Sequence, residues 1–347
     1  MNNFTNIQGK KVLITGNTGF KGSWLTFFLK KLDCKIYGVS DQDYKGIFQL
    51  SEAKKVLEKQ YYLDFIEESS ETIAKLLEEI KPDIIFHFAA QSLVKKAAEN
   101  PIKTIEINSL GTIKLLEAAN KIESVKLVTI ATTDKVYAIP ENLNTEEDSL
   151  HGSEFYSASK VAAENFISAF INSSKRIDLN ILTIRSGNVI GGGDRGEARI
   201  IPDIISAIYN NLKVQIRNPY YIRPWTYILD SLNGYLLASE YCIENKENEI
   251  FNLNSEADNK HNVLYVLNQF LDLNTFEYEI NETSKSEFKE VETLKMQSQK
   301  ARNLLGWESK YNLKEIIKLI YDWENYYTKQ KGIDYTLNEI EKFLTKN

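Results

Sequence analysis

Short apolar runs alternate with helical patterns through the first half of the chain. The apolar runs predict strands at residues 10–16, 35–40, 60–65, 83–90, 126–133 and 179–187. Between several of them, apolar residues recur at helical spacing, in residues 22–32, 71–80, 102–121 and 156–174. Repetition of this kind gives a parallel sheet with helices on both faces. The sequence therefore predicts a doubly wound α/β fold, whose ligands lie at the carboxyl ends of the strands.

The alternation weakens after residue 187. A Gly-rich stretch precedes a helical pattern, one more strand is expected at 250–254, and residues 285–330 are charged and helical in pattern. We expect two parts: a Rossmann sheet domain formed by residues 1–187 and 226–254, and a smaller α/β lobe formed by residues 188–225 and 255–347. The lobe is expected to bind the substrate and to close over it.

The stretch GNTGFKG follows the first strand and opens the first helix. Glycine lets the backbone turn tightly and approach a pyrophosphate, whose charge the helix N-terminus stabilises. No Gly-Lys-Ser/Thr sequence follows, so this is not an ATP phosphate loop. The pattern predicts a dinucleotide site. The expected contacts in the loop are Gly16, Thr18, Gly19, Phe20 and Gly22.

An acidic residue at the end of the second strand refines the choice of cofactor. Asp41 follows Gly22 by about 20 residues, the spacing at which a carboxylate holds the adenosine ribose and disfavours a 2′-phosphate. This favours NAD over NADP. Asp64 is placed either to reach the adenine ring or to face solvent. Further cofactor contacts are expected where the strand 83–90 ends, at Phe88, Ala89 and Ala90.

Tyr156 and Lys160 lie four positions apart in YSASK, on one face of the predicted helix. Tyrosine has a pKa of about 10 and is a poor base at neutral pH. A neighbouring cation lowers that pKa, and the phenolate can then take a hydroxyl proton while hydride leaves for a nicotinamide. The pair is therefore expected to contact both the cofactor and the hydroxyl that reacts.

The motifs GNTGFKG, HFAAQSLV, TTDKVY, YSASK and RSGNVIGGGD together resemble an extended short-chain dehydrogenase/reductase. The similarity covers nearly the whole chain and is most specific for the nucleotide-sugar 4,6-dehydratases, in particular those acting on CDP-glucose. The resemblance implies that Thr133 hydrogen-bonds the sugar hydroxyl, with Tyr156 as base and Lys160 as its helper. It also implies a homodimer, or a dimer of dimers, built on the helices 102–121 and 156–174.

Asp134 and Lys135, directly after Thr133, distinguish the reaction classes. A 4,6-dehydratase must remove the proton at carbon 5 and expel the hydroxyl at carbon 6, whereas an epimerase needs no such pair. We expect Asp134 to be the acid. Lys135 is either the base or an electrostatic stabiliser of the enolate. The alternatives are a dehydratase or epimerase acting on another nucleotide sugar, and a non-catalytic NAD-binding scaffold, which the intact Thr133, Tyr156 and Lys160 disfavour.

A nucleotide sugar carries a diphosphate, so its cleft needs cations and amide donors. A guanidinium group can donate two parallel hydrogen bonds to phosphate oxygens. The resemblance to the dehydratases implies that Arg223 corresponds to the arginine that contacts the diphosphate. The residues expected to bind the substrate are Gln91, Ser92, Asn188, Arg199, Arg217 and Arg223. His87 is expected to be a core histidine.

Composition narrows the partners and the compartment. The net charge is −6, so no basic footprint for nucleic acid is present. No apolar run reaches the roughly 18 residues of a membrane span. The two cysteines, Cys34 and Cys242, are too few and too far apart for a disulfide framework or a zinc site, and we expect buried thiols and a cytoplasmic location.

Overall fold

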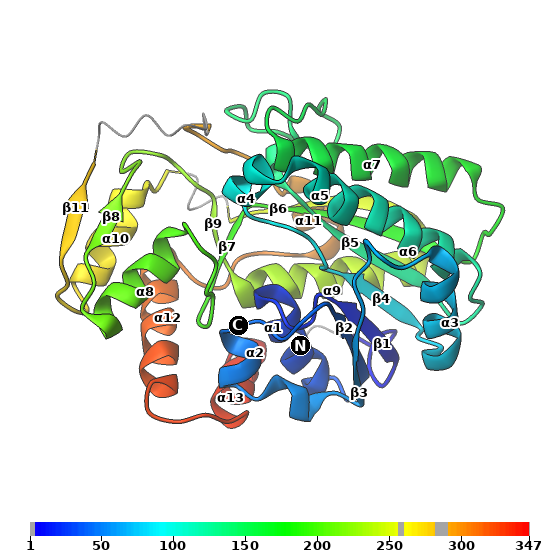
Figure 1. The fold of residues 1–347 in the computed structure, drawn as a ribbon, viewed down its shortest axis with the longest axis horizontal. Coiled ribbons are helices and arrows are strands. Elements are labelled where there is room, and N and C mark those ends of the chain that lie inside the picture. Colours follow the sequence, from blue (N-terminus) through cyan, green and yellow to red (C-terminus); the bar gives the residue numbers. More distant parts are fainter. Residues whose placement is uncertain (1–3, 256–259, 282–290, 347) are drawn as a thin grey trace.

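A computed structural model describes residues 4–255, 260–281 and 291–346. Its centre is a seven-stranded parallel sheet in the order β10-β6-β5-β4-β1-β2-β3 (Figure 1). The strands are β1 (Lys11–Thr15), β2 (Lys35–Ser40), β3 (Lys59–Tyr62), β4 (Ile84–His87), β5 (Leu127–Thr133), β6 (Asn180–Ser186) and β10 (Glu249–Leu253). The order reverses between β1 and β4, which is the topological switch point of a doubly wound fold. The predicted fold class is confirmed.

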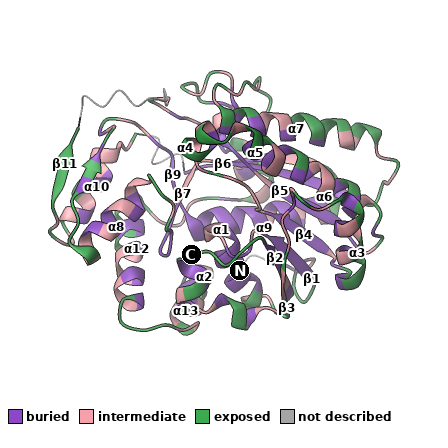
Figure 2. Cartoon of the chain, in the orientation of Figure 1, coloured by how far each residue is buried: buried purple, intermediate pink, exposed green. Residues whose placement is uncertain are grey.

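Two hydrophobic cores lie on the two faces of the sheet. On one face pack α3 (Ser70–Ile80), α6 (Gly111–Asn120) and α7 (Phe155–Ser173); on the other pack α1 (Phe20–Lys31) and α9 (Ile228–Asn245) (Figure 1). Figure 2 shows α9 buried along much of its length. A helix buried on several sides lacks the amphipathic period of a surface helix, and sequence analysis did not predict α9.

Two predicted helices differ from the structure. The expected helix at 102–121 is divided into α5 (Pro101–Ile105) and α6 by a π-helical turn at Glu106–Leu110. In the expected helical stretch 285–330, residues 291–298 are irregular, and helices α11 (Gln299–Leu305) and α12 (Leu313–Tyr327) follow. The remainder of that stretch, 285–290, lies outside the described residues.

A second group of elements lies beside the sheet, at the left of Figure 1. It contains two small parallel pairs, β7 with β9 and β8 with β11. The bounds are β7 (Asn188–Ile190), β8 (Val214–Ile216), β9 (Trp225–Tyr227), β11 (Tyr278–Ile280), α8 (Ile200–Asn210) and α10 (Val263–Leu271). The short elements elsewhere are α2 (Ile47–Leu50), η1 (Ala53–Val56), α4 (Val94–Glu99) and η3 (Asp134–Val136).

The last helix, α13 (Asp334–Thr345), returns to the sheet domain and packs on α1. The rings of Phe28 and Phe343 meet edge to face with centroids 6.2 Å apart. Trp24 of α1 and Trp323 of α12 also lie 6.2 Å apart. These contacts join the end of the chain to the first helix. The division into a sheet domain and a smaller lobe, made from the sequence, stays a prediction. Among the described residues, no helix combines the length and apolarity needed to cross a bilayer.

Candidate active site

The glycine loop between β1 and α1 is closely packed against its surroundings. Gly16 has φ +71°, and a Cβ built there would lie 2.6 Å from the amide nitrogen of Ala89. A Cβ on Gly22 would lie 2.4 Å from the carbonyl oxygen of Gly16, whereas one on Gly19 would lie 3.3 Å from it. Gly16 and Gly22 are therefore required by the backbone itself, while Gly19 is not.

The N-terminus of α1 is open to an anion. Gly19 is its N-cap and provides no side-chain cap, and the first turn carries no acidic residue. The Thr18 hydroxyl donates to the carbonyl oxygen of Gln42 at 2.7 Å, so this side chain holds the loop after β2. Phe20 is half-buried against the core. The loop fits a pyrophosphate, because its amides and the helix dipole favour negative charge.

The strand β4 ends beside this loop. The amides of Phe88 and Ala89 donate to the backbone oxygen and the hydroxyl of Thr15, at 3.0 and 3.3 Å. Ala90 follows and is half-buried, as are Phe88 and Ala89. These three predicted cofactor contacts therefore lie next to Gly16.

Two carboxylates lie near Tyr44 at the neighbouring strand ends. Asp41 is exposed after β2 and accepts a hydrogen bond from the Tyr44 hydroxyl at 3.0 Å. Asp64, after β3, accepts from the amide of Ile66 at 2.9 Å. Burial raises the pKa of Tyr44, and the charges of Asp41 and Asp64 raise it further. Tyr44 was not singled out from the sequence, because an isolated tyrosine in a polar loop carries no motif.

The turn after β5 gathers the predicted acid–base residues. The Thr133 hydroxyl donates to Oδ1 of Asp134 at 3.0 Å and accepts from the amide of Lys135 at 3.3 Å. Asp134 is 3% exposed, and its Oδ2 has no hydrogen-bond partner among the described residues. Burial raises the pKa of Asp134, and the charge of Lys135 opposes the rise. A carboxyl with a raised pKa is suited to donate a proton.

Tyr156 and Lys160 lie on α7, which begins beside this turn. The Glu154 carboxylate caps the helix by accepting from the amides of Tyr156 and Ser157, at 2.7 and 2.8 Å. The Lys160 ammonium donates to the carbonyl oxygen of Ala131 on β5 at 2.9 Å. Both side chains are buried, and the contact with Ala131 places the Lys160 ammonium against β5 near its carboxyl end.

The expected lowering of the Tyr156 pKa does not occur in the chain alone. Burial raises the pKa of Tyr156 to about 12, and a hydrogen bond with Thr133 offsets only part of this. Burial also lowers the pKa of Lys160 to about 8. Desolvation disfavours the phenolate of Tyr156 and the ammonium of Lys160. Its effect on the pKa of Tyr156 outweighs the stabilisation of the phenolate expected from the lysine.

Lys21, within GNTGFKG, is a site residue that sequence analysis missed. Its ammonium crosses from α1 to the hydroxyl of Ser186 at the end of β6, at 2.7 Å. Burial lowers the pKa of Lys21 to about 7, the charges of Lys160 and Arg199 lower it further, and that of Asp134 opposes this. Sequence analysis could not find this role, because the partner of Lys21 lies 165 residues away in the sequence.

Two of the predicted arginines interact electrostatically with the predicted acid–base residues. Arg223 is buried, donates to the carbonyl oxygen of Glu292 at 3.0 Å, and its charge lowers the pKa of Asp134. Arg199, the N-cap of α8, donates to the Ser92 hydroxyl at 3.1 Å, and its charge lowers the pKa of Tyr156. The hydrogen bond between Arg199 and Ser92 thus joins the start of α8 to the loop after β4.

The other predicted substrate residues are placed differently. The Gln91 amide is occupied by its own loop, because its oxygen accepts from the amide of Leu93 at 2.7 Å and its nitrogen donates to the Thr104 hydroxyl at 3.2 Å. Asn188 opens β7 and is half-buried. Arg217 is exposed; burial raises the pKa of Asp203 on α8, and the charge of Arg217 opposes this rise.

His87 is a core histidine, as expected. It is 3% exposed, and its ring nitrogens bond the hydroxyls of Thr15 at 2.7 Å and Thr112 at 3.1 Å. The two cysteines are buried free thiols, also as expected.

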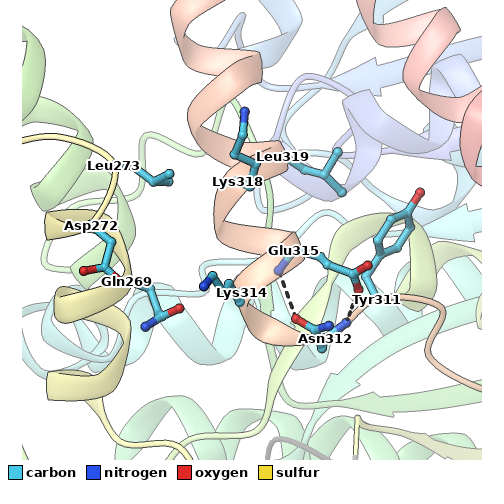
Figure 3. A pocket seen from close by; sticks show the side chains of 9 residues that line it. All are labelled: Gln269, Asp272, Leu273, Tyr311, Asn312, Lys314, Glu315, Lys318 and Leu319. Atoms are coloured by element: carbon cyan, nitrogen blue, oxygen red, sulfur yellow. Dashed lines mark hydrogen bonds between the residues drawn. The ribbon is translucent and has the colours of Figure 1, made fainter.

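A cavity of about 460 Å³ lies apart from the predicted acid–base residues, between α10 and α12 (Figure 3). Its lining includes Gln269, Asp272 and Lys314, and contains none of the residues predicted for catalysis or ligand binding. The candidate site is therefore the group of residues around Asp134 and Tyr156, at the carboxyl ends of the strands.

Comparisons with known proteins identify the family of the chain. A family profile described as GDP-mannose 4,6 dehydratase matches residues 13–320. A CDP-glucose 4,6-dehydratase of Salmonella typhimurium is 34% identical over 330 residues, covering 91% of this chain and 90% of the relative. A UDP-glucose 4-epimerase of Lactobacillus helveticus is 26% identical over 92% of this chain and 98% of the relative.

Solved structures show the same fold. A UDP-glucose 4-epimerase from Stenotrophomonas maltophila, with bound NAD and formylated UDP-arabinopyranose, superposes with a TM-score of 0.80 at 19% identity, covering 92% of this chain and 99% of that one. The matched sequence family, its length and the shared fold lead to one conclusion: the chain belongs to the GDP-mannose 4,6-dehydratase family, the nucleotide-sugar dehydratases of the extended short-chain dehydrogenase/reductases.

Proposed function

We propose that the protein is a hydro-lyase that removes water across carbons 5 and 6 of a nucleotide-activated hexose, with CDP-glucose as its substrate. The observation that carries the proposal is Asp134, a buried carboxyl with a raised pKa in the turn between Thr133 and Lys135. Dehydration needs such a proton donor, whereas 4-epimerisation does not. The choice of CDP-glucose is supported by the relative at 34% identity.

The cofactor of the proposal is NAD. Gly16 and Gly22 leave space that a Cβ would fill, and the N-terminus of α1 lacks a negative side chain, so the loop suits a pyrophosphate. Asp41 would hold the adenosine ribose and repel a 2′-phosphate. When bound, NAD supplies an acceptor for the hydride of carbon 4 and its donor to carbon 6.

The side chains of the site divide the proton transfers among themselves. Tyr156 takes the proton of the hydroxyl at carbon 4, which Thr133 orients by hydrogen bonding, and Lys160 stabilises the phenolate. The resulting ketone acidifies the proton at carbon 5. Asp134 gives a proton to the hydroxyl leaving carbon 6. With hydride returned to carbon 6 and a proton returned to carbon 5, the product would be a 4-keto-6-deoxy nucleotide sugar.

Lys135 has two roles compatible with its half-buried position. As base, it would take the carbon 5 proton directly. As stabiliser, it would hold the negative charge of the enolate through its ammonium. We favour the role of base for Lys135. Asp134 donates a proton to the leaving hydroxyl, so a second group must accept the proton of carbon 5.

Substrate binding and assembly complete the proposal. Arg223 and Arg199 would bind the diphosphate, and Ser92 and Asn188 would contact the rest of the substrate. We propose a homodimer, or a pair of them, because large apolar side chains are exposed on α5, on the π-helical turn and on α7: Ile102, Ile105, Leu110 and Phe166. The cytoplasm is the proposed location, in keeping with two free thiols.

The test is incubation of the purified chain and NAD⁺ with CDP-, dTDP-, GDP- and UDP-hexoses separately, followed by mass spectrometry. Loss of one water from CDP-glucose is expected, and Tyr156→Phe should abolish it. Loss from another nucleotide sugar would change only the specificity. A change of stereochemistry at constant mass would make the protein an epimerase and contradict the proposal.

A further inference from the structure

Glu164 and Arg185 form a buried ion pair. The pair lies next to the turn of Thr133, Asp134 and Lys135, which we call the catalytic turn. Glu164 is on α7, four residues after Lys160 and on the same helix face. Its carboxylate accepts from the Thr132 hydroxyl at 2.7 Å and from two nitrogens of Arg185, at 2.6 and 3.0 Å. The Arg185 and Glu164 side chains are 3% and 5% exposed. The pair is therefore well removed from solvent.

The pair connects several elements that meet at the site. Arg185 of β6 lies opposite Thr132 of β5 in the sheet register. It donates to the Tyr137 hydroxyl at 3.1 Å and to the carbonyl oxygen of Glu146 at 3.0 Å. The Tyr137 hydroxyl in turn donates to Asn252 of β10 at 2.6 Å. The segments on both sides of the catalytic turn are thus held to one buried centre.

Two residues of α7, one helical turn apart, hold consecutive residues of β5. Lys160 donates to the carbonyl oxygen of Ala131, and Glu164 accepts from the hydroxyl of Thr132. Thr133 comes next and begins the catalytic turn. These two contacts hold the helix that carries the phenol against the strand that leads into the acid, Asp134.

We propose that Glu164 is a positioning residue for the reaction, which fixes α7 against the end of β5 and places a carboxylate one helical turn from the Lys160 ammonium. The proposal rests on the proposed function, because Lys160 matters only if its ammonium assists Tyr156. A buried ion pair is weak evidence for stability alone, since apolar replacements are often neutral. Its place beside Lys160 gives it a role that packing alone would not require.

The charges around Lys160 come from four elements, because Arg185 of β6 is paired with Glu164 at 2.6 Å. Lys21 of α1 is a second cation, and its charge interacts unfavourably with that of Lys160. His87 of β4 is buried and has a pKa lowered to about 3, so it is neutral at working pH. From α7 come Tyr156, whose phenol is neutral at rest, and Glu164, whose charge raises the pKa of Lys160. Glu164 therefore opposes both burial and Lys21.

The experiment compares pH profiles of kcat/KM for the full chain with NAD⁺ and the sugar that the wild type dehydrates. Glu164→Gln keeps the shape and removes the charge, so Lys160 should lose its proton at lower pH. We expect the alkaline limb to move down by about one pH unit. Glu164→Asp keeps the charge on a shorter side chain, and its limb should stay within roughly 0.3 unit of the wild type.

Glu324→Gln is a matched control, because Glu324 is 2% exposed and pairs with Arg195 at 2.6 Å in another part of the chain. Its limb should not move. Thr132→Val tests positioning without changing charge, and should lower kcat roughly tenfold while leaving the limb in place. It also serves if Glu164→Gln fails to fold.

The proposal is overturned if a folded Glu164→Gln has the wild-type limb, or if Thr132→Val has the wild-type kcat. Absence of water loss with every sugar in the wild type would instead reject the proposed function, so the two failures are distinguishable.

Discussion

The Thr133 hydroxyl donates to Oδ1 of Asp134 at 3.0 Å, which leaves Oδ2 of the same buried carboxyl without a partner among the described residues. Because burial raises the pKa of this carboxyl, a protonated Asp134 can serve as a donor. The hydrogen bond from Thr133 fixes which oxygen stays available. The turn is thereby arranged for proton donation to a leaving hydroxyl.

Asp134→Asn should lower kcat by roughly 10²- to 10⁴-fold, because the amide cannot donate a carboxyl proton to the leaving hydroxyl. Oxidation at carbon 4 should continue, so reduced nicotinamide should accumulate in its ultraviolet absorbance. Asp33→Asn is the control, since Asp33 is exposed and asparagine tolerates its φ of 55°. Normal water loss by Asp134→Asn would contradict the assignment.

Lys135 can be tested with a preformed 4-keto substrate, which bypasses oxidation. If Lys135 is the base, Lys135→Met and Lys135→Arg should both lose exchange of the carbon 5 proton with deuterated water, by roughly 10²-fold or more. Arginine keeps the charge but cannot act as a base. Substantial exchange in the arginine variant alone would assign Lys135 to enolate stabilisation.

The two loop glycines should separate folding from cofactor binding. Gly22→Ala places a Cβ 2.4 Å from a backbone oxygen and should destabilise the chain by at least about 2 kcal/mol in urea unfolding. Gly19→Ala meets that oxygen only at 3.3 Å and should leave stability within about 1 kcal/mol. It should nevertheless weaken NAD⁺ binding in titration calorimetry. Unchanged affinity would exclude the pyrophosphate from this turn.

His87 should make stability depend on pH. Its pKa is lowered to about 3 in the folded chain by burial and is about 6.5 when unfolded, so the stability present above pH 6.5 is lost as the pH falls toward 3. Between pH 7 and 5 this group should remove about 2 kcal/mol of unfolding free energy. His87→Gln should reduce the slope, whereas His151→Gln, at an exposed position, should not. Equal slopes would contradict the prediction.

Arg176 should contribute strongly to stability. Its guanidinium donates to the carbonyl oxygens of Ala119 and Ile122, at 2.9 and 2.7 Å, and so satisfies the end of α6. Arg176→Met should cost about 2–4 kcal/mol of unfolding free energy, because several backbone oxygens lose a charged donor. Asp178→Asn removes a half-exposed carboxylate that pairs with Arg176 at 2.8 Å and with Lys126 at 2.6 Å, and should cost less than about 1 kcal/mol. Similar losses in both would assign the effect to the ion pair.

Local sequence determined the features that depend on neighbouring residues. The spacing of YSASK placed Tyr156 and Lys160 on one helix face, and GNTGFKG predicted a tight turn that opens a helix. The strands were recognisable because a buried parallel strand reads as a short apolar run. The helix α9 was not, because burial on several sides removes the period by which a helix is recognised.

Tertiary structure decided which distant residues meet and what their surroundings do to them. Lys21 reaches Ser186, and Glu164 pairs with Arg185, only because the parallel strands β1, β5 and β6 end on the same side of one sheet. Burial raised the pKa of Tyr156, where the sequence alone led us to expect a lower one. Spacing fixes chemistry within a helical turn, whereas desolvation and long-range charge depend on the packed fold.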